Sequence, residues 1–267
     1  MLTPEFGGAM IDWIESQSTF VIAGIVFCLC YTLAAGVFGA ATILSRRPVA
    51  EQLKTISPVT LTPLAVVLGL LIVFLAGRVW ENVGRANEYI RQEAGALSKV
   101  MLFANALPPE VRTKLRAAMT QHVDFVVAQD WPAMTTGRAN QRTEPIALTN
   151  AMAALFSFTP GQSDQTLAQQ SAVAAVEKAF EARQNRIRLS QTEIGSTQWI
   201  VICILTMLIL VTTAMIHMDK PAAMAATLLI FSTAVGASLV LLMENDRPFA
   251  AGGITLTPTA FREIVLN

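Results

Sequence analysis

Charged residues are scarce in this chain, and they are unevenly distributed. Only 14% of its 267 residues are Asp, Glu, Lys or Arg, whereas about a quarter is usual in soluble domains. Four long stretches contain none of them: 16–45, 55–77, 194–218 and 221–243. Each covers the roughly 20 residues that an α-helix needs to cross a hydrocarbon core. The alternative, four buried helices of a large soluble core, fits poorly because such helices are usually shorter and carry a polar face.

The chain also lacks the residue patterns that several other functions require. The net charge is zero and no Lys/Arg cluster is interleaved with aromatics, so nothing favours nucleic-acid binding. The three cysteines lie in apolar stretches, and His122 and His217 have no ligand residues at helical spacing, so we expect no metal site. There is no nucleophile paired with a base, no phosphate-binding glycine loop and no carboxylate pair. We therefore expect neither enzymatic activity nor a cofactor.

The apolar stretches predict an all-α integral membrane protein, because backbone amides in lipid must be satisfied within their own helix. We expect transmembrane helices at 19–44, 59–77, 197–216 and 222–243. A helical, cytoplasmic domain at 78–195 is inserted between the second and third. Segment 1–18 precedes the first helix, and 244–267 form a C-terminal tail. Because Glu5, Asp12 and Glu15 but no basic residue precede the first apolar run, we expect that helix to be retained and not cleaved as a signal peptide.

The second membrane helix is expected to continue into the inserted domain. No proline occurs from 64 to 107, and apolar residues recur every three or four positions from Val79 to Ala104. Four glycines oppose this interpretation, since each costs up to about 1 kcal/mol relative to Ala in a helix. Further helices are expected at 109–129, ended by Asp130-Trp131-Pro132, and at 146–156 and 165–192.

The distribution of arginine bears on orientation. Arginines gather near the membrane ends of the insert, and the positive-inside rule then places the insert and both termini in the cytoplasm. These arginines are Arg78, Arg85, Arg91, Arg183, Arg186 and Arg188. Arg46-Arg47 and the acidic N-terminal segment favour the opposite orientation.

The second helix resembles the pore-lining helix of bestrophins, with Pro63, the Leu68-Gly69 step and the Arg78-Val79-Trp80 run at matching separations. The chain is most similar to the bacterial bestrophin-like membrane family. Further similarities are Glu93-Ala94, Asp130-Trp131-Pro132, an arginine-bearing helix before the third span, and Asp246-Arg247-Pro248-Phe249 after the fourth.

The sequence also departs from the bestrophin pattern. Leu70 replaces an aromatic residue, Val79 replaces a tryptophan, and Ala250-Ala251-Gly252-Gly253 expands a shorter small-residue step. No dense acidic cluster resembles a calcium clasp, so calcium gating is not carried over.

This resemblance implies a pentameric channel that conducts small anions, with Thr62, Val66 and Leu70 at a constricting neck. Their spacing of four residues puts them on one helix face, with Phe74 next. An apolar ring of this kind can gate by dewetting. The alternative is that these side chains only pack against neighbouring helices.

Several other residues are candidates for a structural or a functional role. Arg78 either anchors at the headgroups or attracts anions to an inner vestibule, and Trp80 is typical of a membrane-interface belt. Asp246-Arg247-Pro248-Phe249 either forms a local ion pair that pins the tail or binds a neighbouring subunit. Glu93 is expected to be structural, paired with Arg85, Arg91 or Arg116.

The leading hypothesis is thus a homo-oligomeric, bestrophin-like channel of a bacterial inner membrane, surrounded by lipid. A non-conducting accessory or scaffold subunit of a larger membrane complex is the alternative. A proton-channel stator is disfavoured because the spans contain no Asp or Glu.

Overall fold

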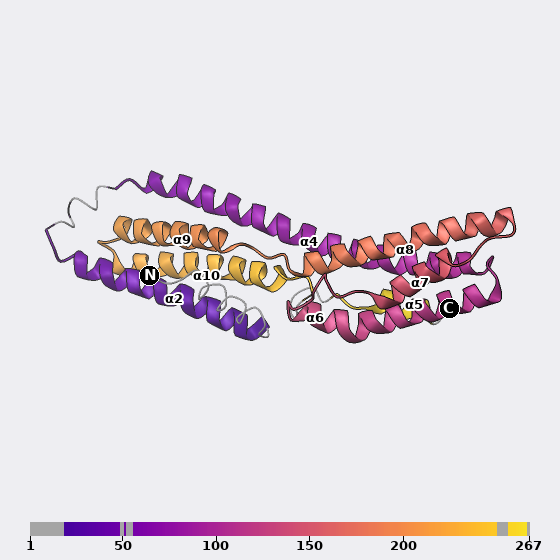
Figure 1. Cartoon of the computed structure of the whole chain (residues 1–267). Coiled ribbons are helices and arrows are strands. Elements are labelled where there is room, and N and C mark those ends of the chain that lie inside the picture. The colour runs from indigo at the N-terminus through magenta and orange to yellow at the C-terminus, as the bar shows by residue number, and fades with distance from the viewer. Residues whose placement is uncertain (1–18, 49–50, 52–55, 250–255, 266–267) are drawn as a thin grey trace. The chain divides into compact units, whose positions relative to one another are not determined.

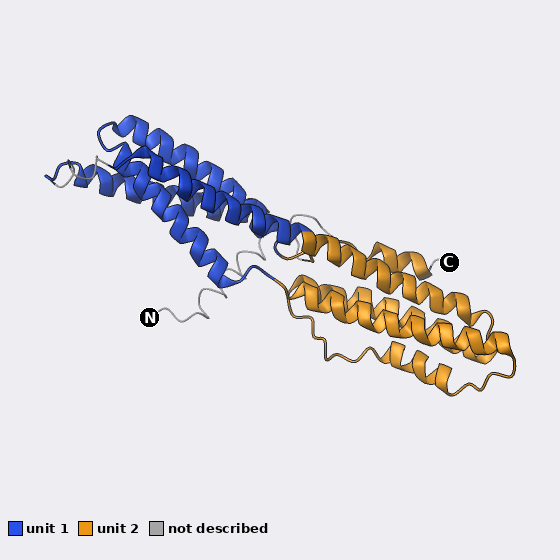
Figure 2. Cartoon of the chain, turned by 90° about the horizontal axis from the view of Figure 1, so that it is seen from above, with its two compact units in different colours: residues 1–80, 193–246, 251–253 blue, residues 81–192, 247–250, 254–267 orange. Residues whose placement is uncertain are grey.

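The computed structural model describes residues 19–48, 51, 56–249 and 256–265, and every regular element among them is helical (Figure 1). The chain divides into two compact units (Figure 2). Unit 1 comprises residues 1–80, 193–246 and 251–253, and unit 2 comprises 81–192, 247–250 and 254–267. The predicted all-α fold class with four long apolar helices is confirmed.

Among the described residues, four helices are long and apolar enough to cross a membrane, and these spans belong to unit 1. They are α2 (Thr19–Leu44), the first part of α4 (Leu61–Ala104), α9 (Ser196–Ile216) and α10 (Pro221–Asn245). Prolines stand at or just before the starts of two of these helices. Proline lacks a backbone N–H, which costs nothing in the first turn of a helix. Pro221 opens α10, and Pro58 opens the short 3-10 turn η1 (Pro58–Thr60), whose Val59 N–H is capped by the Ser57 hydroxyl at 3.3 Å.

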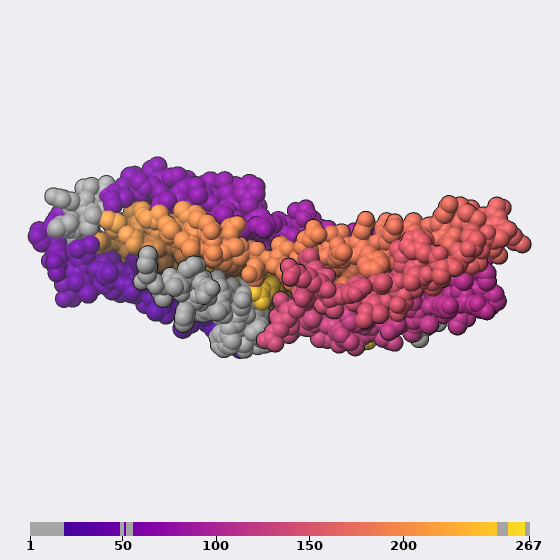
Figure 3. Space-filling view, in the orientation of Figure 1, coloured from indigo at the N-terminus to yellow at the C-terminus, as the bar shows by residue number. Residues whose placement is uncertain are grey.

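Within unit 1, α9 lies between α4 and α2 (Figures 1 and 3). Leu68 and Leu75 of α4 pack with Ile202 and Ile209 of α9 in one buried cluster. Other clusters join α2 to α9 and α10. At Gly236 of α10, an added Cβ would come within 2.9 Å of the Phe27 ring of α2. This small residue therefore permits close contact between α10 and α2.

In the part of the chain that the structure describes, unit 2 is built from the second part of α4 and six further helical segments. These are α5 (Pro109–Phe125), the π-helix η2 (Val126–Asp130), α6 (Trp131–Thr135), α7 (Ile146–Phe156), α8 (Ser163–Ser190) and α11 (Thr259–Val265). The predicted continuation of the second membrane helix into the insert is confirmed, since α4 runs 44 residues despite its glycines. The prediction that Asp130-Trp131-Pro132 ends a helix is wrong. Pro132 lies in the first turn of α6, where its ring is tolerated, so the chain stays helical.

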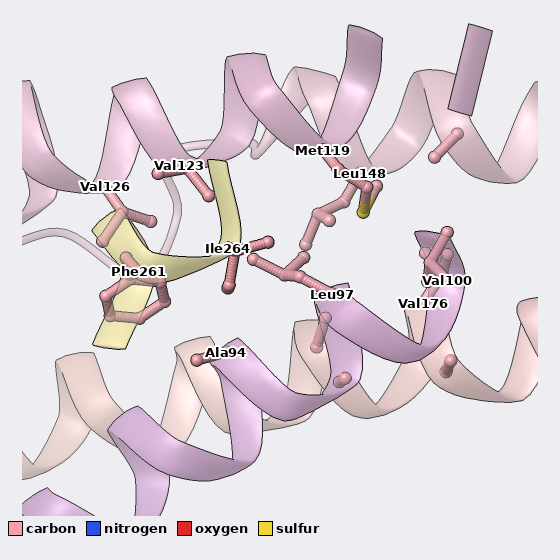
Figure 4. Close-up of a cluster of buried hydrophobic side chains, with 14 of the residues drawn as sticks. Ala94, Leu97, Val100, Met119, Val123, Val126, Leu148, Val176, Phe261 and Ile264 are labelled. Carbon is pink, nitrogen blue, oxygen red and sulfur yellow. The ribbon is translucent and has the colours of Figure 1, made fainter. Parts of the chain in front are cut away.

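One hydrophobic core holds unit 2 together (Figure 4). Leu97 and Val100 of α4 meet Met119 of α5 and Val176 of α8 in this core. Helix α11, within the segment predicted to be a tail, adds Phe261, which is fully buried. Burying side chains of this size contributes about 1.5–3 kcal/mol each. This core fixes the second part of α4, which carries the buried Glu93.

Candidate functional site

The membrane part of α4 has two distinct faces. Leu68, Leu75 and Val79 are buried against other helices of unit 1. Thr62, Val66, Leu70 and Phe74, the residues predicted to line a pore, are all exposed. Val66 and Leu70 are each 53% exposed and Phe74 is 73% exposed. We call these four residues the apolar stripe of α4.

The glycines of α4 lie close to this stripe on the helix surface. At 100° per residue, Gly69 and Gly77 fall within about 60° of Thr62. An added Cβ at either position would meet no atom within 4 Å. Packing within the chain therefore does not account for these glycines, although each weakens the helix.

Arg78 and Trp80 are exposed on either side of the buried Val79. Beyond them, Glu81 and Arg85 form an exposed ion pair one turn apart. The polar residues therefore begin where the apolar run ends, as an interfacial position requires.

A network of buried charged residues joins four helical segments of unit 2. The Glu93 carboxylate of α4 accepts hydrogen bonds from Nε and Nη2 of Arg186 of α8, at 2.7 and 3.1 Å. The Nε2 atom of His122 of α5 lies 3.0 Å from the same carboxylate. Asp130 at the end of η2 accepts two bonds from Arg183, at 2.8 and 2.9 Å, and one from Arg186 at 3.4 Å.

Almost no part of this network reaches water, since Glu93, His122 and Arg186 are 0% exposed. Two carboxylates face two guanidinium groups, so the formal charges cancel, which buried charges require. The arginines also lie over aromatic rings, Arg186 at 5.5 Å from the Phe261 centroid. Because its charged side chains are buried and paired with one another, the network is suited to holding α4, α5, η2 and α8 together.

The network shifts the pKa of its central carboxyl group. Burial alone would raise the pKa of Glu93, but Arg186 and the hydrogen bond from His122 lower it. The pKa of Glu93 consequently lies below the ordinary carboxyl value, because two partners stabilise the charged form.

Sequence reasoning missed these pairings. The predicted partners of Glu93, which were Arg85, Arg91 or Arg116, are wrong, and His122 is not isolated. The Arg186 partner lies 93 residues further along the chain. Helical spacing identifies neighbours three or four positions away and cannot reveal such a pair. The only signal was the presence of several arginines on a helix rich in alanine.

The Asp246–Phe249 segment makes contacts in both units. In unit 1, the buried Asp246 carboxylate accepts the backbone N–H of Ile194, at 2.9 and 3.0 Å. In unit 2, the Phe249 ring meets Trp131 edge-on at 5.6 Å between centroids. Pro248 is buried and Arg247 is half-buried. The contact between Asp246 and the Ile194 N–H was not foreseen in the sequence.

Among the described residues, no group of three or more His, Cys, Asp or Glu side chains could hold a metal ion.

Comparison with known proteins adds the family context. The Bestrophin-like domain model matches residues 28–261. A variant of a bacterial bestrophin homolog from Klebsiella pneumoniae has a similar fold, with a TM-score of 0.67, 12% identity, and coverage of 90% of this chain and 96% of that one. A second structure of the Klebsiella homolog gives a TM-score of 0.65 at 12% identity, over 90% and 94% of the two chains. A structure described as a membrane protein gives 0.68 at 12% identity, over 91% and 96%. Identities this low show the fold alone, and no curated protein matches the chain.

Proposed function

The chain belongs to the bestrophin-like family, and from this premise we propose that it is an oligomeric ion channel of a bacterial inner membrane. In this proposal α4 lines the pore, and copies of the chain, five by resemblance, surround a common axis. The apolar stripe of Thr62, Val66, Leu70 and Phe74 forms the neck.

One observation carries the proposal: α4 is the least covered of the four membrane helices. In its most apolar 18-residue window, 11% of the residues are buried within the chain, against 22–33% in the other three spans. A helix exposed to this extent faces either lipid or other subunits. Lipid contact gains nothing from Gly69 and Gly77, whereas small residues allow helices to approach closely. The exposed glycines therefore favour other subunits.

The charges beyond the neck support anions as the permeating ions. Exposed residues of α4 from 78 to 99 carry four positive charges, on Arg78, Arg85, Arg91 and Lys99, and two negative charges, on Glu81 and Glu88. Glu93, the third acid of this stretch, is buried and neutralised by Arg186. A surface with this excess of positive charge raises the local concentration of anions.

Planar-bilayer recording tests the proposal. The purified oligomer should conduct, and Val66→Ala or Leu70→Ala should raise the current several-fold, because a smaller apolar ring wets more easily. Ile230→Ala is the matched control, since Ile230 of α10 is 70% exposed but lies outside the stripe; its current should equal that of the wild type.

No current from the wild type or from either stripe variant, in oligomers verified by mass, would contradict conduction. A foreign subunit recovered at fixed stoichiometry from native membranes would then favour an accessory role.

A further inference from the structure

A groove on unit 2 is not part of the proposed pore neck. Its cavity of about 500 Å³ is lined by three helices, α4, α5 and α11. This volume lies within the range of small-molecule sites, about 300–1,000 Å³. Ala94 and Ile264, both labelled in Figure 4, belong to its lining and to the core beneath it. The floor of the groove is therefore held in place by packed side chains.

Two arginines give the groove positive charge. The Arg91 guanidinium has no hydrogen-bond or salt-bridge partner within the described part of the chain. Arg116 donates to the side-chain oxygen of Asn105 at 3.1 Å, which orients its guanidinium in the groove. Glu263 also lines the groove, so two arginines and one glutamate leave one net positive charge. Guanidinium groups match carboxylate and phosphate oxygens in a bidentate geometry.

The rest of the lining is largely apolar. Met101, Leu102 and Ile264 contribute aliphatic surface beside the arginines, and Leu102 is 63% exposed. A hydrophobic side chain exposed next to an unpaired cation suits a ligand that has both an anionic head and an apolar body.

Gly95 provides space in this lining. A Cβ added at Gly95 would meet no atom within 4 Å. A side chain added at this position therefore starts in open space in the groove lining.

We propose that this groove binds a small organic monocarboxylate with a short aliphatic chain. Arg91 and Arg116 hold the charged head, and Met101, Leu102 and Ile264 contact the chain. A single negative charge on the ligand balances the net charge of the groove. Because the three helices each supply lining residues, the bound ligand links α4 to α5 and α11. The site does not depend on whether the protein conducts ions.

Calorimetric titration of the full-length chain in detergent, with hexanoate as the probe and micelles alone as the blank, tests this site. Hexanoate should give saturable heat. Acetate, which lacks the chain, and hexylammonium, which has the opposite charge, should bind at least about tenfold more weakly. Arg91→Gln and Arg116→Gln should each weaken hexanoate binding about tenfold.

Two glycine variants separate occlusion of the groove from general damage. Gly95→Leu should abolish binding. Gly84→Leu, on the same helix with equally open space but outside the groove lining, should bind like the wild type. Retained helicity by circular dichroism verifies both folds. The proposal is overturned by a wild type without saturable heat, by undiminished binding in Gly95→Leu, or by acetate or hexylammonium binding as tightly as hexanoate.

Discussion

Glu93 is fully buried and carries a formal charge, so removing either that charge or one of its partners changes the stability of unit 2. Its carboxylate is shared between Arg186 and His122. Loss of the carboxylate would leave the Arg186 guanidinium in the core with one carboxylate contact, the longer one to Asp130 at 3.4 Å. Breaking a buried ion pair on one side costs about 3–5 kcal/mol.

We expect the stability conferred by Glu93 to disappear in acid. Its pKa is lower in the folded chain than the ordinary value of 4.5 that applies on unfolding. The unfolded chain therefore takes up a proton first, and the stabilisation, complete above pH 4.5, is lost as the pH falls through the folded pKa. Unfolding temperatures measured from pH 7 down to pH 3 should show this decline.

The variant Glu93→Gln provides the comparison for that measurement. It should be destabilised by about 3–5 kcal/mol at pH 7, and its unfolding temperature should depend less on pH below 4.5. Glu81→Gln, which removes the acid of an exposed pair, should cost at most about 1 kcal/mol. Equal pH dependence in the wild type and Glu93→Gln would show that another group controls the acid transition.

At the residue scale, the sequence indicated types of residue but not their partners. The common face of Thr62, Val66, Leu70 and Phe74 followed from a spacing of four, but their exposure depends on how α4 packs and was not predicted. The pairing of Glu93 with Arg186 depends on how α4 and α8 pack, and nothing local to either helix encodes it.

Among the helices, glycines of the same chain have opposite roles. Gly84 of α4 faces open space, whereas Gly236 of α10 faces the Phe27 ring, which would lie 2.9 Å from an added Cβ. The first glycine only weakens its helix, and the second permits close contact between α10 and α2.

Alanine substitutions should therefore change stability in opposite directions. Gly84→Ala should stabilise the protein by about 0.5–1 kcal/mol, because alanine loses less backbone entropy in a helix. Gly236→Ala should destabilise it by about 1–3 kcal/mol, because the Phe27 ring has to move. Chemical unfolding in detergent, followed by helicity, measures both. A stabilised Gly236→Ala variant would show that α2 and α10 are packed less tightly than a separation of 2.9 Å implies.

The sequence predicted the long helices better than the short helical segments between and after them. The length of α4 followed from an absence of proline and an apolar repeat that continued beyond the membrane. The π-helix η2 could not be predicted, because one extra residue per turn leaves no distinct local pattern. Helix α11 was missed since seven residues give too short a periodicity, and its stability comes from burying Phe261 in the core of unit 2.

For the whole molecule, the number of membrane crossings determines which segments lie on the same side of the membrane. One span, the first part of α4, runs from the connector at 45–60 to the unit 2 helices. One span, α9, runs from those helices to the connector at 217–220. If all four helices cross the membrane, both connectors lie on one side and unit 2 lies on the other. The number of spans was predicted from the long charge-free runs in the sequence. The sequence alone left the orientation open, because arginines occur on both sides.

We expect the unit 2 helices in the cytoplasm, because in the sequence more arginines flank the spans on the unit 2 side than lie in the connectors. After Cys28, Cys30 and Cys203 are replaced by alanine, single cysteines at Ser57→Cys, Lys220→Cys and Gly161→Cys report the side of each segment, since all three positions are exposed. A membrane-impermeant maleimide should label the first two in intact spheroplasts, and Gly161→Cys only after permeabilisation. The reverse pattern would place unit 2 outside. Labelling of Ser57→Cys and Gly161→Cys from the same side would mean that α4 does not cross the membrane, and its apolar stripe could not then line a pore.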